Sequence, residues 1–139
     1  MKVLLDTAPL VALLSEQDQY HLWATAQVAD LKPPLLTCEA VLSEAHFLLR
    51  RYFDSPKPLT GLLSSGLVQL AFHLDEEIEA VAALMEHYAD VPMSLADACL
   101  VRMSELHAGS VVLTTDSDFA IYRKHRRQTI ATLMPPAGR

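Results

Sequence analysis

The sequence predicts an α/β fold: a single-domain three-layer α/β/α sandwich with a central, mainly parallel sheet. Two observations support this prediction. Short apolar runs alternate along the chain with longer segments of helical periodicity, which is typical of parallel strands joined by right-handed helical crossovers. The chain has 139 residues, 51% of them hydrophobic, which suits one domain with a sizeable core. We expect residues 1–134 to form this domain and the tail at 135–139 to be disordered.

The expected strands are short apolar runs that lie between turns and helical segments. They cover residues 2–6, 35–37, 67–72, 111–114 and 129–133. The runs Val3–Leu5 and Val111–Leu113 are continuously apolar, which favours strands that helices cover on both faces. The run at 67–72 alternates loosely between apolar and polar residues, as a half-buried strand does.

The expected helices carry recognisable signals at their ends. They cover residues 7–14, 18–30, 38–52, 56–65, 75–88 and 94–107. Residues 75–77 are three acids in a first turn, where they face the positive end of the helix dipole. Ser94 and Asp97 match the S-x-x-D capping pattern. Gly66 and Gly109 follow the fourth and sixth helices, where glycine commonly ends a helix.

Composition excludes several classes of protein. The chain has 17 acidic and 11 basic residues, which argues against a protein that binds nucleic acid by bulk positive charge. It does not exclude a protein that binds nucleic acid with the help of its own divalent cations. Cys38 and Cys99 are too few for a four-thiolate zinc site or a disulfide framework, and we expect them in the core. No apolar run is long enough for a membrane helix, and Asp6 interrupts any signal-peptide core. We therefore expect a cytoplasmic protein.

Two acidic positions follow predicted strands. Asp6 ends the first strand, and Asp116 follows the fourth, in the turn Thr114-Thr115-Asp116-Ser117-Asp118. Ligands of open α/β sheets bind outside the carboxyl ends of the strands, so these acids are candidate site residues. Asp6 has an alternative role as the N-cap of the next helix, and the turn at 114–118 has one as a simple Asx turn.

Two further acids lie on predicted helices. A helical projection from Val41 places Glu44 on the core-facing side of its helix, near Leu48, although a solvated surface glutamate is the alternative. Asp97 lies beside Leu100 on its helix, and its alternative role is that of a capping residue. A cap and a metal ligand are compatible roles for one carboxylate.

Together, these acids predict a site for a hard divalent cation. Carboxylates that converge at one edge of a sheet repel one another, and Mg²⁺ or Mn²⁺ with oxygen ligands relieves that repulsion. The chain shows no nucleophile motif, so hydrolysis of a phosphodiester by metal-activated water fits best. A basic cluster downstream of the acidic turn could hold an RNA backbone, or it could be a solvated helix end. It comprises Arg123, Lys124, Arg126 and Arg127.

These motifs resemble the PIN domain. Asp6-Thr7 after a strand, Glu44 in EAVLSE, Asp97 in SLADA and the run TTDSDF at 114–119 look like the four acidic motifs of that family, in order and across essentially the whole chain. The length is similar to that of VapC-type toxins. The resemblance implies a Mg²⁺- or Mn²⁺-dependent endoribonuclease, commonly a homodimer, that a small protein antitoxin inhibits. It assigns metal binding to Asp6, Glu44, Asp97, Asp116 and Asp118, catalysis to the first four, and supporting roles to Thr7 and Thr114.

Three other interpretations remain open from the sequence. A haloacid-dehalogenase-like phosphatase needs a second aspartate two residues after the first, and Ala8 occupies that position. A PIN-fold protein of RNA processing would have no toxin role. A non-enzymatic binding module would use the acids only as caps, and Mg²⁺ titration would then reveal no saturable, carboxylate-dependent site.

Overall fold

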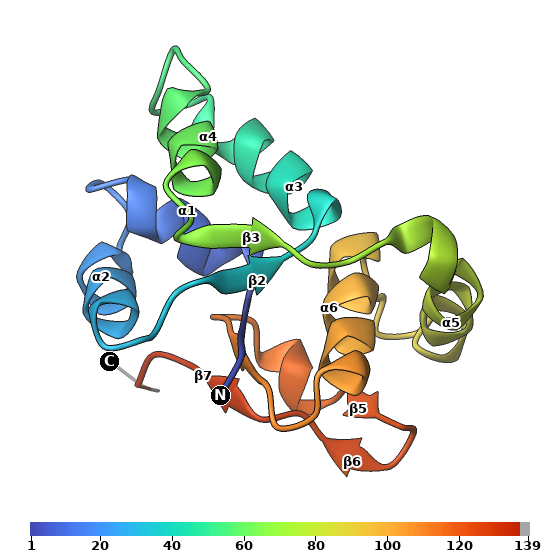
Figure 1. Cartoon of the computed structure of the whole chain (residues 1–139). Coiled ribbons are helices and arrows are strands. Elements are labelled where there is room, and N and C mark those ends of the chain that lie inside the picture. The colour runs from blue at the N-terminus through green and yellow to red at the C-terminus, as the bar shows by residue number, and fades with distance from the viewer. Residues whose placement is uncertain (137–139) are drawn as a thin grey trace.

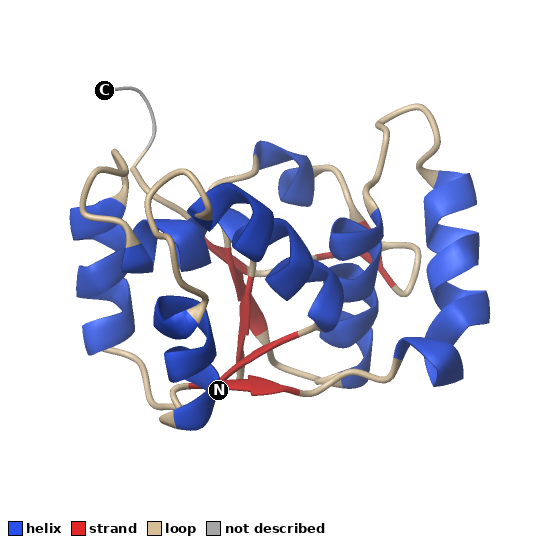
Figure 2. Cartoon of the chain, turned by 90° about the horizontal axis from the view of Figure 1, so that it is seen from above, coloured by secondary structure: helices blue, strands red, loops and turns tan. Residues whose placement is uncertain are grey.

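A five-stranded, fully parallel sheet forms the centre of the computed structural model, which describes residues 1–136 (Figure 1). The strand order across the sheet is β3-β2-β1-β4-β7. The strands are β1 (Val3–Leu5), β2 (Leu35–Thr37), β3 (Val68–Leu70), β4 (Val111–Leu113) and β7 (Thr132–Leu133). The predicted fold class is confirmed: helices lie on both sides of the strands (Figure 2).

Six α-helices and one short 3₁₀ helix connect the strands of residues 1–136. They are α1 (Thr7–Leu14), α2 (His21–Ala29), α3 (Glu39–Leu49), α4 (Lys57–Ser64), α5 (Leu74–His87), α6 (Leu95–Leu106) and the 3₁₀ helix η1 (Ser117–Ala120). Each α-helix overlaps its predicted range, with ends that differ by at most a few residues, whereas no range was predicted for η1. No helix in this part of the chain combines the length and apolar character needed to cross a membrane.

The hydrophobic core is centred on the middle of the sheet. Strands β1, β2 and β4 are buried along their whole length, as the continuously apolar sequences of β1 and β4 predict. Leu4, Leu5 and Val112 have no exposed surface, and each such side chain contributes roughly 1.5–3 kcal/mol through burial. Cys38 and Cys99 are buried and free, in agreement with their expected place in the core.

The topology brings the ends of β1 and β4 together. The chain leaves β1 toward β2 and β3, and it returns to the opposite side of β1 as β4. Leu5 pairs with Leu113 at the carboxyl ends of the two strands, and the backbone N–H of Asp6 donates to the carbonyl of Leu113 at 3.1 Å. This is the point of an α/β sheet at which ligands bind. The residues that follow β1 and β4 are therefore neighbours in space.

The segment at the carboxyl end of the chain differs from the prediction. One strand was expected at 129–133, but the structure has two: β6 (Gln128–Thr129) pairs with β5 (Arg123–Lys124) in an antiparallel hairpin, and β7 joins the main sheet. The buried Ile130 lies between them, where the chain passes from the hairpin to the sheet. Of the tail expected to be disordered, residues 137–139 lie outside the described part of the chain, and 135–136 are neither helix nor strand.

Candidate active site

Asp6 is a buried carboxylate at the centre of the candidate site. It caps α1 by accepting the backbone N–H of Thr7 at its Oδ1 atom, at 2.7 Å, and its Oδ2 atom accepts the Thr114 hydroxyl at 2.6 Å. Burial, together with repulsion from Asp97 and Asp116, raises the pKa of Asp6 from 3.8 to about 6, although the two hydrogen bonds oppose the rise. Asp6 is therefore both the N-cap of α1 and a member of the acidic site.

Thr114 joins the two strand ends through its hydroxyl group. The hydroxyl donates to Asp6 and also accepts the backbone N–H of Asp116 at 2.9 Å. Asp116 in turn accepts the backbone N–H of Asp118 at 2.9 Å and so caps η1. The Asx turn considered as an alternative is therefore present, and it holds Asp116 beside Asp6.

We expect Thr114→Val to destabilise the protein by about 1–3 kcal/mol, because it leaves the Asp116 N–H and one oxygen of the buried Asp6 without their partner. Urea unfolding of the metal-free protein measures this change. Thr115→Val is the control, since it makes the same replacement of a hydroxyl by a methyl group at the half-buried neighbouring threonine. Equal stability of the two variants would contradict a bridging role for Thr114.

Asp97 reaches the site from the first turn of α6. Ser94 caps this helix by accepting the Asp97 backbone N–H at 3.0 Å, so the predicted cap is confirmed. The carboxylate Oδ2 atom accepts the hydroxyl of Tyr122 at 2.9 Å. Burial raises the pKa of Asp97, the Tyr122 hydrogen bond opposes the rise, and repulsion from Asp116 adds to it. Asp6 therefore experiences the charges of Asp97 and Asp116, and Asp97 experiences that of Asp116.

Glu44 lies differently from the prediction. The buried residues of α3 are Val41, Ala45 and Leu49, whereas Leu48 is 38% exposed, so the helical projection that placed Glu44 on the core-facing side is wrong. The Glu44 side chain is exposed. It still faces the candidate site, because the Thr7 hydroxyl donates to its Oε2 atom at 3.2 Å. Thr7 thus connects Glu44 to the turn that holds Asp6.

The donor set suits a hard divalent cation in its chemistry. Asp6, Asp97 and Asp116 offer carboxylate oxygens at the carboxyl edge of the sheet, and their mutual repulsion is the kind that a cation relieves. Among residues 1–136, no three acidic, histidine or cysteine side chains are already arranged as a metal site. Binding would therefore require movements that bring these oxygens to one ion.

Comparison with known families identifies one match. The PIN domain family matches residues 3–124, which cover most of the chain. The chain belongs to the PIN domain family. PIN domains are typically nucleases that use divalent metals, so membership supports a metal-dependent nuclease. A search of curated proteins found no match.

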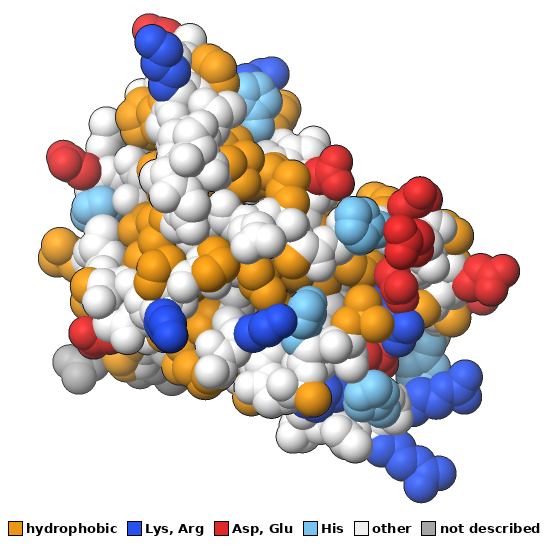
Figure 3. Space-filling view, viewed as in Figure 1, with side chains coloured by type: hydrophobic (Ala, Val, Ile, Leu, Met, Phe, Trp, Pro, Cys, Tyr) orange, Lys and Arg blue, Asp and Glu red, His pale blue; other side chains and the backbone are white. Residues whose placement is uncertain are grey.

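The basic cluster of this PIN domain lies on a hairpin. The alternative prediction, that these residues form a solvated helix end, is therefore wrong. Arg123 and Lys124 form β5, and His125 and Arg126 turn the chain with positive φ angles of 50° and 69°. Figure 3 shows Lys and Arg side chains gathered at the lower right, where Figure 1 places the hairpin. The side chain of Arg123 donates to the carbonyls of residues 120–122, so one of its nitrogens is already engaged.

Helix α6 anchors the hairpin. The carboxylate of Glu105 accepts the backbone N–H of His125 at 2.7 Å and pairs with Arg102 at 3.0 Å. Arg102 also pairs with Glu77 of α5 at 2.7 Å. Glu105 follows Asp97 by eight residues, which is about 12 Å along the helix axis. The hairpin therefore begins directly after Tyr122, which contacts the acidic site, and its turn at His125 is anchored about two helical turns further along α6.

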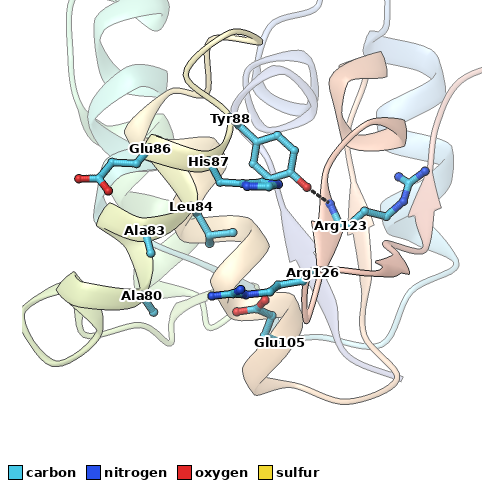
Figure 4. A pocket seen from close by; sticks show the side chains of 9 residues that line it. All are labelled: Ala80, Ala83, Leu84, Glu86, His87, Tyr88, Glu105, Arg123 and Arg126. Carbon is cyan, nitrogen blue, oxygen red and sulfur yellow. Dashed lines mark hydrogen bonds between the residues drawn. The ribbon is translucent and has the colours of Figure 1, made fainter.

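A groove of about 540 Å³ lies between α5, α6 and the hairpin (Figure 4). Ala83 and Leu84 of α5 line it, and the Tyr88 hydroxyl accepts the Arg123 backbone N–H at 2.9 Å at one end. In Figure 4 the Arg126 side chain extends over the groove in front of Glu105. None of the candidate acids lines this groove, so it is separate from the acidic site.

Tyr122 was not among the site residues predicted from the sequence. Its hydroxyl contacts Asp97 across 25 residues of sequence, and its side chain is fully buried. A buried tyrosine hydroxyl usually has a hydrogen-bond partner, but the sequence does not indicate which one. The only available signal is the position of Tyr122 shortly after the acidic run at 114–119.

Proposed function

We propose that this PIN domain is a Mg²⁺- or Mn²⁺-dependent endoribonuclease that hydrolyses RNA phosphodiesters. The observation that supports it is the meeting of Asp6, Asp97 and Asp116, from three distant segments, at the carboxyl edge of the sheet. The resemblance adds Glu44 and Asp118 as ligands. A divalent cation, when bound, would activate water for attack and stabilise charge on the phosphate.

The residues of the chain have distinct roles in this proposal. Asp6 is held rigidly by Thr7 and Thr114, so it would provide the fixed oxygen around which the other ligands adjust. Asp97 and Asp116 would provide further carboxylate oxygens for the ion. The Thr7 hydroxyl orients Glu44, which is exposed and therefore accessible from solvent. Each of these groups binds or orients a ligand; none of them needs to act as a nucleophile.

A cleavage assay tests the proposed chemistry. Purified protein is incubated with single-stranded RNA and with Mg²⁺, Mn²⁺ or a chelator, and products are followed on denaturing gels. We expect cleavage only when the metal is present. Cleavage that persists in chelator, or metal binding that does not depend on the carboxylates, would contradict the proposal. The second result would favour a binding module that uses the acids as caps.

We propose that the exposed arginines of the hairpin contact the RNA backbone. Neutralising two phosphate contacts should reduce the slope of log affinity against log salt by about 1.4 for single-stranded RNA. We therefore expect Arg126→Gln with Arg127→Gln to weaken RNA binding and flatten its salt dependence. Fluorescence anisotropy in chelator, at several salt concentrations, measures both effects without cleavage.

Two other arginines provide the matched control for the hairpin. Arg50 and Arg51 are also adjacent and exposed, but they lie at the end of α3. Their double replacement by glutamine changes the net charge by the same amount. A salt slope that falls equally in both double variants would mean that bulk charge, and not the hairpin, contributes to binding.

We further propose that the nuclease is the VapC-type toxin of a type II toxin–antitoxin pair, a cytoplasmic homodimer that a small protein antitoxin inhibits. The support is the resemblance in motif order and length. Induced expression should arrest growth, and Asp97→Asn should abolish the arrest at equal protein level. A small reading frame beside the gene, encoding a DNA-binding antitoxin, should restore growth when it is co-expressed. Cleavage without growth arrest would instead favour an RNA-processing role for the same fold.

A further inference from the structure

We propose that Tyr122 is a positioning residue that holds the Asp97 carboxylate in its place within the acidic site. The hydroxyl of Tyr122 donates to the Oδ2 atom of Asp97 at 2.9 Å. The Tyr122 side chain has no exposed surface. This inference rests on the proposed function, because it concerns how one of the proposed metal ligands is oriented.

The Tyr122 ring is fixed by two aromatic neighbours. Its centroid lies 5.2 Å from that of Tyr88, with an interplanar angle of 70°, and 5.3 Å from that of Phe119, with an angle of 86°. Both arrangements are edge-to-face contacts, which aromatic pairs favour. The hydroxyl cannot leave Asp97 without disturbing this packing. Tyr122 is therefore a rigid donor, whose position the core determines.

The Asp97 carboxylate needs such a donor. It is only partly buried and repels Asp116, so in the absence of a cation its favoured motion is away from the other acids and toward solvent. A hydrogen bond from a rigid phenol opposes that motion. It also occupies one carboxylate oxygen, and so fixes the direction in which the group is presented. Hydrogen-bond partners of metal ligands typically contribute 10- to 100-fold to metal affinity.

Tyr88 provides a matched comparison within the same aromatic cluster. Its hydroxyl accepts the backbone N–H of Arg123 and is not bonded to any of the candidate acids. Tyr122→Phe and Tyr88→Phe each remove one buried hydroxyl and keep the ring. A purely structural role of the Tyr122 hydroxyl would therefore make the two variants alike.

The experiment compares wild-type protein with Tyr122→Phe and Tyr88→Phe by two measurements. Crystal structures of the metal-free proteins report the orientation of Asp97. Mn²⁺ titration, followed by electron paramagnetic resonance, reports the dissociation constant. We expect Asp97 to turn away from Asp116 only in Tyr122→Phe, with Mn²⁺ affinity about 10- to 100-fold weaker, whereas Tyr88→Phe keeps both properties within twofold of wild type.

The two measurements separate this proposal from the proposed function. An unchanged orientation of Asp97 in Tyr122→Phe overturns the positioning role, whatever happens to Mn²⁺ binding. Equal losses of Mn²⁺ affinity in both variants also overturn it, because they would reflect a loosened core. If wild-type protein binds no Mn²⁺, the proposed function fails, and a rotated Asp97 in the metal-free crystals of Tyr122→Phe still supports the role of Tyr122.

Discussion

Asp97→Asn is expected to reduce RNA cleavage by at least about 10²–10³-fold while the protein stays folded. Removal of a single group that stabilises charge in an active site typically has an effect of this size. Asparagine keeps the size of the side chain and can still accept the Tyr122 hydroxyl, so the packing around α6 is retained. The change removes one negative charge from the site. Initial cleavage rates at saturating Mg²⁺ measure the effect, and circular dichroism verifies the fold.

Asp90→Asn is the control for this variant. Asp90 is exposed and lies just before α6, between α5 and the cap at Ser94, so its replacement removes the same charge from a nearby surface. We expect it to cleave RNA like the wild type. If Asp97→Asn cleaves at the wild-type rate, in preparations shown to contain no other nuclease, then the acidic site is not the site of catalysis.

The sequence was sufficient to predict the strand ends that make up the site. Asp6 and Asp116 could be located because β1 and β4 are continuously apolar, and because parallel strands place their carboxyl ends at one edge of the sheet. Asp97 was a candidate because of its place beside Leu100 on the predicted helix, and its alternative role in the capping pattern is also present, together with a contact to Tyr122. In each case a short local signal was enough, and the fold brought the residues together.

Elsewhere the local signals did not determine the structure. Glu44 was misplaced because Leu48 was counted as a core residue, although it is 38% exposed. Hydrophobic character alone does not tell an exposed apolar face from a buried one. The hairpin at 123–129 was missed because His125 and Arg126 take up its positive φ angles, where glycine or asparagine would be the usual signal.

Asp6→Asn is expected to leave the stability of the metal-free protein at pH 7 unchanged or to raise it by up to about 3 kcal/mol. The folded protein raises the pKa of Asp6 from 3.8 to about 6, so the native state binds this proton more tightly than the unfolded state. The stabilisation from the protonated carboxyl is fully present below pH 3.8 and is lost as the pH rises to about 6. Above that pH the charged, buried group opposes folding.

Asparagine removes this pH dependence and keeps most of the local contacts. It is an effective N-cap, so its oxygen can still accept the Thr7 N–H. Its amide nitrogen faces the Thr114 hydroxyl, which must turn and accept instead of donate, and this change reduces the gain. We therefore expect the advantage of the variant to be largest near pH 7 and to disappear toward pH 4.

Urea unfolding in chelator at pH 4.5, 5.5 and 7 measures this difference. Asp18→Asn is the matched control, because Asp18 also accepts a backbone N–H, from Tyr20 at 2.8 Å, but is half-exposed. Added Mg²⁺ should stabilise the wild type more than Asp6→Asn, since a ligand stabilises only the state that binds it. A loss of about 2 kcal/mol or more in Asp6→Asn without metal would mean that Asp6 serves the fold as a cap, and that the acidic site is not under electrostatic strain.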